Sequence, residues 1–127
     1  MLRALIVEDG ALFRQLVWEV LNSRFPSIET YEADARDEAL EKVKAYHPDI
    51  IFIDIRLRDG NGLELTKKIK TEYPNTLVII LTNYDLPEYR EAAFQYKADH
   101  FIPKDSFLGM MNSVFLDLPM ELIAKGQ

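Results

Sequence analysis

The chain has 127 residues, no cysteine and a formal net charge of −6. The length and the 48% hydrophobic content suit one domain with a buried core. The lack of cysteine excludes disulfides, thiolate metal sites and a cysteine nucleophile, and the acidic balance argues against nucleic-acid binding. Because the sequence shows no signal peptide and no apolar run of membrane-spanning length, we expect a cytoplasmic protein that does not enter a membrane.

Five short segments predict β-strands, and three of them are continuous apolar runs. Such runs are typical of parallel strands that are covered on both faces, whereas the second segment alternates more and the fifth is short. In chain order the predicted strands are residues 2–7, 28–33, 49–55, 77–81 and 98–102.

Helical spacing fills the segments that follow these strands. The first of them, residues 11–23, places Leu12, Leu16 and Val20 at four-residue steps. The predicted helices are residues 11–23, 36–46, 63–72, 87–96 and 106–116. Strands and helices therefore alternate five times, which predicts a parallel sheet with helices on both faces.

Charged and polar side chains stand at the ends of four predicted strands. Glu8 and Asp9 follow the first strand, Asp54 lies at the end of the third, Thr82 follows the fourth, and Lys104 follows the fifth. Ligands of such sheets bind outside the carboxyl ends of the strands. We therefore expect these five residues to meet at one edge of the sheet.

Three carboxylates in one pocket raise each other's pKa values, so the arrangement calls for a cation. Oxygen ligands favour Mg²⁺, which would also let an anionic phosphate approach. In such a site Asp54 would be the nucleophile, Thr82 would donate a hydrogen bond to a phosphoryl oxygen, and Lys104 would pair with another. Each residue alone is more often a cap, a turn residue or a solvated side chain. Their combination is what indicates phosphoryl transfer.

In this order, the motifs resemble the receiver domains of bacterial two-component response regulators. The residues that carry the resemblance are Val7-Glu8-Asp9, Phe52-Ile53-Asp54-Ile55, Gly62-Leu63-Glu64, Leu81-Thr82 and Phe101-Ile102-Pro103-Lys104. The resemblance implies an α/β, flavodoxin-like, doubly wound sheet of five parallel strands in the order 2-1-3-4-5 with five helices. We expect one receiver domain over residues 1–118, and a C-terminal tail or the start of a linker over residues 119–127.

The resemblance also implies an acceptor and a metal site. Asp54 would accept a phosphoryl group from a sensor histidine kinase or a histidine phosphotransfer protein. Asp9, Asp54 and the backbone carbonyl of Arg56 would bind Mg²⁺ directly, and Glu8 would bind it through water. Such a protein is a signalling component and not a metabolic enzyme, because it catalyses only its own phosphorylation and slow dephosphorylation.

A switch follows from the same resemblance. Thr82 and Phe101 match its switch pair, and Lys104 matches its phosphate-sensing lysine. Phosphorylation would draw in Thr82 and Lys104 and turn Phe101 inward. That change would reshape the face made by the fourth helix, fifth strand and fifth helix, where a downstream protein or a second copy in a homodimer would bind.

Some positions depart from the family's pattern. Glu8 replaces the commoner aspartate but keeps the carboxylate, Arg58 stands where a proline is frequent, and Asn83 stands where a small residue is usual. Arg56 and Tyr84 each lie two residues after a predicted site residue. We expect both at the mouth of the pocket, because alternate residues at a strand end point the same way.

Two other functions fit the predicted fold. A pseudo-receiver would be an interaction module that is never phosphorylated, and Mg²⁺-dependent labelling by acetyl phosphate would distinguish it. An electron carrier with flavin mononucleotide would need a Ser-, Thr- or Gly-rich phosphate loop after the first strand. Here that loop reads Glu8-Asp9-Gly10-Ala11, which would repel phosphate without a metal, and a colourless protein would exclude the flavin.

Overall fold

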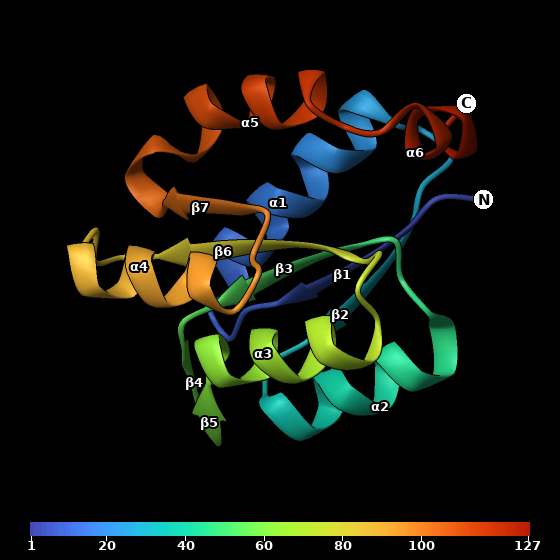
Figure 1. Cartoon of the computed structure of the whole chain (residues 1–127). Helices are drawn as coiled ribbons and strands as arrows, with labels where there is room; N and C mark the ends of the chain where they lie inside the picture. The colour runs from blue at the N-terminus through green and yellow to red at the C-terminus, as the bar shows by residue number, and fades with distance from the viewer.

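A computed structural model describes all 127 residues and contains a five-stranded parallel sheet between two layers of helices (Figure 1). The strands are β1 (Arg3–Val7), β2 (Glu29–Ala33), β3 (Ile50–Asp54), β6 (Leu77–Thr82) and β7 (His100–Pro103). They are ordered β2-β1-β3-β6-β7, and every neighbouring pair is parallel. Since β6 and β7 are the predicted fourth and fifth strands, the predicted order is confirmed.

Helices cover both faces of the sheet, as the alternation of elements predicted. Figure 1 shows α1 (Ala11–Arg24) and α5 (Phe107–Leu116) on one face. The other face carries α2 (Arg36–Tyr46), α3 (Gly62–Glu72) and α4 (Pro87–Gln95). Each layer packs on the sheet through its own apolar core cluster of 17 buried residues, and the sheet separates the two clusters.

The register of the strands fixes the edge at which side chains can meet. Val7 lies beside Ile53 in the β1–β3 pair, and Asp54 lies beside Leu81 in the β3–β6 pair. The residues that follow β1 and β6 therefore lie near the level of Asp54. All five residues of β3 are buried, so its apolar side chains anchor the strand and leave Asp54 at its end.

Short elements that the sequence analysis did not predict surround this edge. A hairpin of β4 (Arg56–Leu57) and β5 (Gly60–Asn61) follows β3 directly. A single 3₁₀ turn, Lys104–Ser106, links β7 to α5. Strands of two residues and single turns are too short to show a hydrophobic period.

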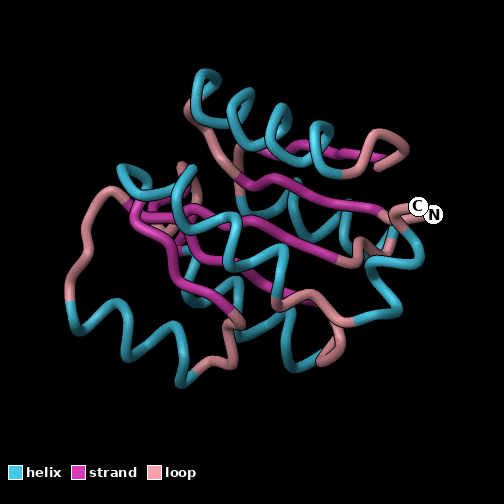
Figure 2. Tube along the Cα trace, turned by 90° about the horizontal axis from the view of Figure 1, so that it is seen from above, coloured by secondary structure: helices cyan, strands magenta, loops and turns pink.

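The tail or linker expected after residue 118 contains a sixth helix in this structure, α6 (Met120–Lys125). Its Leu122 is buried in the core cluster beneath α1 and α5, together with Leu118. Six residues give too little periodicity for a helix to be predicted. The helix brings the C-terminus beside the N-terminus (Figures 1 and 2).

None of the helices has the length and apolar composition needed to cross a membrane.

Candidate functional site

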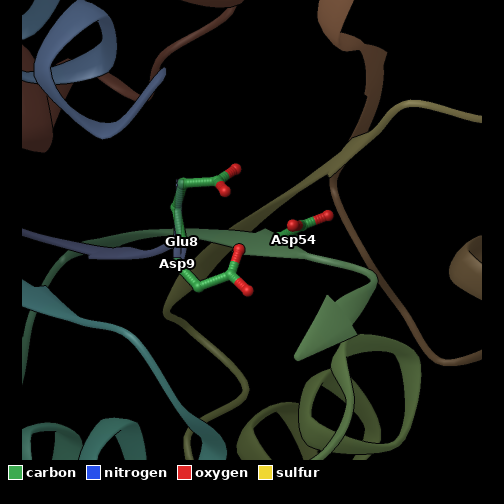
Figure 3. A group of neighbouring side chains, drawn as sticks. All are labelled: Glu8, Asp9 and Asp54. Carbon is green, nitrogen blue, oxygen red and sulfur yellow. The ribbon is translucent and has the colours of Figure 1, made fainter. Parts of the chain in front are cut away.

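The three predicted carboxylates meet at the carboxyl edge of the sheet. Glu8 and Asp9 follow β1, Asp54 ends β3, and one carboxylate oxygen from each lies within 4.8 Å of the others. Figure 3 shows Glu8 and Asp9 pointing to opposite sides of the edge, with Asp54 beside them on the next strand. Asp9 is exposed, whereas Glu8 and Asp54 are buried.

Lys104 brings a positive charge to the buried pair. Its Nζ lies 2.6 Å from Oε1 of Glu8 and 3.3 Å from Oδ2 of Asp54. The ammonium also lies 5.0 Å from the centre of the Phe13 ring, which favours a cation. The other oxygen of Glu8 accepts a hydrogen bond from the backbone N–H of Gly10 at 2.8 Å. Both oxygens of Glu8 are therefore engaged by protein groups.

Burial and charge oppose each other in this cluster. Burial raises the pKa of Asp54 and of Glu8, although Lys104 acts to lower both. Burial lowers the pKa of Lys104, but its two carboxylate partners outweigh this effect and leave that pKa above its usual value. Lys104 is therefore protonated at neutral pH, whereas burial makes a negative charge on either carboxylate energetically costly.

Thr82 is present at the site, but its hydroxyl is bonded within its own loop. The β3–β6 register puts Leu81 beside Asp54, so Thr82 lies one residue further toward the edge. Its Oγ1 accepts a hydrogen bond from the N–H of Tyr84 at 2.9 Å and lies 3.1 Å from the Tyr84 carbonyl, to which it can donate. To donate to a phosphoryl oxygen, the hydroxyl would have to break its hydrogen bond to the Tyr84 carbonyl.

Phe101 is buried, with 2% of its surface exposed. The guanidinium carbon of Arg90 in α4 lies 4.7 Å from the centre of its ring. The inward turn of Phe101 on phosphorylation stays a prediction, and this structure shows the ring in its inward position. The ring packs with the core cluster beneath α2, α3 and α4, which accounts for its inward position.

Arg56 and Tyr84 lie against each other, as expected for two side chains at the entrance to one site. The guanidinium carbon of Arg56 is 4.5 Å from the centre of the Tyr84 ring. This contact joins the β4–β5 hairpin, which follows Asp54, to the β6–α4 loop, in which Tyr84 exchanges hydrogen bonds with Thr82. Both side chains are exposed.

Three contacts near the site were missed by the sequence analysis. Phe13 packs on the lysine, Arg90 packs on the buried aromatic ring, and Arg14 donates a hydrogen bond to the Glu8 carbonyl at 2.8 Å. Arg14 also pairs with Glu32 at the end of β2. Phe13 and Arg14 lie in the first turn of the helix after Glu8, which was the only available signal. Nothing in the sequence marks Arg90.

The donor set suits a hard divalent cation. The cluster offers carboxylate oxygens and contains neither histidine nor cysteine, which fits Mg²⁺ better than zinc. Asp9 and Asp54 are the carboxylates best available to it, because Lys104 and Gly10 already engage Glu8. This occupation of Glu8 agrees with a more distant, water-mediated role for that residue.

The sheet order and the acidic edge with its lysine are features of one class of signalling domain. Residues 4–120 match the response regulator receiver domain, and the chain belongs to this family. The resemblance noted in the sequence is thereby confirmed, and the flavin carrier is set aside.

The relatives include proteins with different activities, one an enzyme and one a DNA-binding activator. A protein-glutamate methylesterase/protein-glutamine glutaminase of Pyrococcus abyssi is 33% identical over 98% of this chain and 33% of its own length. The DNA-binding transcriptional activator DevR/DosR of Mycobacterium tuberculosis is 31% identical over 83% of this chain and 48% of its own length. The chain thus spans a third to a half of these relatives.

Solved structures support the same assignment. The receiver domain of the putative response regulator NarL from Mycobacterium tuberculosis has a TM-score of 0.80 and 30% identity, and the match covers 99% of this chain and 98% of that chain. The response regulator domain of Thermotoga maritima CheB has a TM-score of 0.74 and 26% identity, with 91% and 92% covered.

Proposed function

We propose that the domain accepts a phosphoryl group on Asp54 in a Mg²⁺-dependent reaction. The observation that carries this proposal is the position of Asp54, at the end of a buried strand, beside two carboxylates and 3.3 Å from the Lys104 ammonium. A carboxylate oxygen of Asp54 would attack phosphorus, and the bond from phosphorus to the donor's imidazole nitrogen would break. The donor would be a sensor histidine kinase or a histidine phosphotransfer protein.

The residues of the site would have two roles, metal binding and contact with the phosphoryl group. Asp9, Asp54 and the Arg56 carbonyl would hold Mg²⁺, and Glu8 would act through water. Bound Mg²⁺ supplies positive charge that lets an anionic phosphoryl group approach carboxylates and steadies its oxygens. Lys104 would turn from Glu8 toward a phosphoryl oxygen as the two Asp54 oxygens become part of the acyl phosphate.

Phosphorylation would act as a switch through Thr82. The phosphoryl group replaces one negative charge with about two and adds strong hydrogen-bond acceptors. These acceptors compete with the Tyr84 carbonyl for the Thr82 hydroxyl, so the β6–α4 loop would change its conformation. The change at the α4–β7–α5 face would come from this loop, from Phe101 and from Arg90, whose guanidinium lies over the Phe101 ring.

The output would then depend on what that face binds. We propose a downstream protein or a second copy of the domain as its partner, with no direct contact of this domain to nucleic acid. Methylesterase or DNA-binding output belongs to longer relatives, of which the matches cover 33% and 48%. A cytoplasmic location is part of the same proposal.

Mass spectrometry after incubation with acetyl phosphate and Mg²⁺ tests the acceptor. We expect a stoichiometric phosphoryl adduct on the wild type and none on Asp54→Asn, which keeps the size of the side chain but removes the nucleophilic carboxylate. An undiminished adduct on the variant would exclude Asp54 as the acceptor. No adduct on the folded wild type would favour a pseudo-receiver that is never phosphorylated.

A further inference from the structure

Helix α2 begins without a cap of its own. Ala35 occupies its N-cap position and has no side chain that accepts a hydrogen bond. The first N–H groups of a helix have no partner within the helix and need one from outside. In this structure the partner is Asp59, in the turn of the β4–β5 hairpin. Its two carboxylate oxygens accept from the N–H of Arg36 at 2.5 Å and of Asp37 at 3.2 Å.

The contact depends on a close approach between the hairpin and the helix. A Cβ at Gly60 would lie 3.0 Å from Cδ of Arg36, so the Arg36 side chain packs closely against the hairpin. The N–H of Arg36 lowers the pKa of Asp59, as expected for a carboxylate that accepts backbone hydrogen bonds at the positive end of a helix. Asp59 is therefore ionised at neutral pH and bound to α2.

The same hairpin carries the backbone that follows Asp54. Its base is closely packed, because the N–H of Gly62 donates to the Ile55 carbonyl at 2.7 Å and a Cβ at Gly62 would lie 2.0 Å from the Asp54 carbonyl oxygen. Arg56 pairs with Asn61 across the hairpin. Asp59 holds the tip to α2, and an exposed ion pair joins Arg58 to Asp34 in the loop before α2. A single exposed ion pair contributes little, whereas Asp59 accepts two backbone hydrogen bonds, so Asp59 is the principal link.

From these contacts we infer that Asp59 is a positioning residue for the Mg²⁺ site. It holds the hairpin against α2 and so fixes the direction of the Arg56 carbonyl, three residues earlier in the chain. This inference rests on the proposed function, in which that carbonyl is a metal ligand. Mg²⁺ demands near-ideal octahedral geometry at about 2.1 Å, so a small rotation of one carbonyl weakens binding.

Two variants separate positioning from simple helix capping. Asp59→Ala removes both the cap and the link. Adding Ala35→Ser gives α2 a cap of its own, because serine is favoured at an extended N-cap residue such as this one. The double variant A35S/D59A should therefore regain thermal stability in EDTA but leave the hairpin unlinked. Arg58→Ala, next to Asp59 in the same turn, is the matched control.

Titration with Mg²⁺ alone, followed by backbone amide NMR signals, measures the dissociation constant. We expect Asp59→Ala and A35S/D59A to raise it by about tenfold, the lower end of the range for groups that orient metal ligands. Arg58→Ala and Ala35→Ser should leave it unchanged. A double variant that regains both stability and affinity would reduce Asp59 to a helix cap and overturn the inference.

Mg²⁺ binding by the wild type separates a failure of the Asp59 positioning role from a failure of the proposed metal site. If it binds Mg²⁺ and Asp59→Ala binds equally well, only the positioning role of Asp59 is overturned. If folded wild type shows no Mg²⁺-dependent shifts near Asp9 and Arg56, the proposed metal site fails and the inference fails with it.

Discussion

Asp54 holds its negative charge at a position where burial disfavours it. The side chain is 7% exposed, and burial outweighs the effect of Lys104 on its pKa. Asp9 adds a further repulsion, which also acts to raise that pKa. The residues that make the site attractive to a cation are therefore a source of instability when no cation is bound.

This instability predicts that Asp54→Asn is more stable than the wild type in EDTA at neutral pH. Below its ordinary pKa of 3.8, the Asp54 carboxyl is protonated in both the folded and unfolded states, so its charge carries no penalty. Above the raised pKa of the folded state the penalty is complete. The gain in Tm should therefore begin to appear as pH rises above about 4 and be complete above the raised pKa of the folded state, and about 1 kcal/mol would give roughly 4 °C.

Thermal melts of both proteins across this pH range provide the measurement. Asp9→Ala should show a smaller gain, because Asp9 is exposed and water screens its charge. If Asp54→Asn melts lower than the wild type in EDTA at neutral pH, the Lys104 pairs outweigh burial, and the view of an unfavourable charge is wrong.

At this scale the sequence predicted the residues that stand at strand ends. Glu8, Asp54 and Lys104 could be placed together because parallel strands align their carboxyl ends. The inward position of Phe101 could not be predicted, because it depends on core packing. The contact of Asp59 with α2 joins residues 22 and 23 apart, and no local pattern in the sequence reports such a pairing.

Among the elements, the long periodic ones were predicted and the short ones were not. The segments of β1, β3 and β6 are mainly apolar, and in an alternating α/β chain such runs predict buried parallel strands. The β4–β5 hairpin has two residues in each strand, and its existence depends on contacts of Leu57, Asp59 and Gly62 with other elements. These contacts exist only once the sheet and α2 are in place.

The pairing of this hairpin with the β6–α4 loop predicts how long a phosphoryl group stays on Asp54. Hydrolysis needs a water in line with the bond between oxygen and phosphorus. Arg56 and Tyr84, stacked at 4.5 Å, would restrict the path of that water. Arg56→Asn with Tyr84→Glu should shorten the lifetime, by about tenfold if about 1.4 kcal/mol of barrier is lost.

Decay of radiolabelled phosphoprotein in excess Mg²⁺ measures that lifetime. Tyr84→Phe is the matched control, because it keeps the ring that packs on Arg56, and its decay should equal that of the wild type. Equal half-lives for the double variant and the wild type would mean that these side chains do not restrict the water, and Asn83 would be the next residue to examine.

Across the whole molecule, the two ends of the sheet have different roles. The carboxyl end carries the charged site, where Lys104 pairs with Glu8 and the Thr82 hydroxyl is hydrogen-bonded to the Tyr84 carbonyl. The other end is closed by α6, where Lys125 pairs with Asp49 at 2.7 Å and the other Asp49 oxygen accepts from the N–H of Arg3 at 3.0 Å. Asp49 directly precedes β3, and Arg3 begins β1.

Packing of α6 at this end predicts a loss of stability without a loss of chemistry. Leu122 is 8% exposed and belongs to the core cluster with Leu118. Leu122→Ala should lower the free energy of unfolding by about 2 kcal/mol, the low end for a buried leucine, because α6 lies at the margin of the core. Phosphorylation by acetyl phosphate should be unchanged at temperatures where the variant is folded, because the site lies at the opposite end of the strands.

Urea denaturation of Leu122→Ala and of the control Met120→Ala provides the comparison. Met120 is 77% exposed on the same helix, so its replacement should change the free energy of unfolding very little. If Leu122→Ala is as stable as Met120→Ala, residues 119–127 add nothing to the folded core and are the tail or linker expected from the sequence. If the expected difference is found, the folded unit extends beyond residue 118, and a domain cut at that position would expose Leu118 and the apolar side chains that α6 covers.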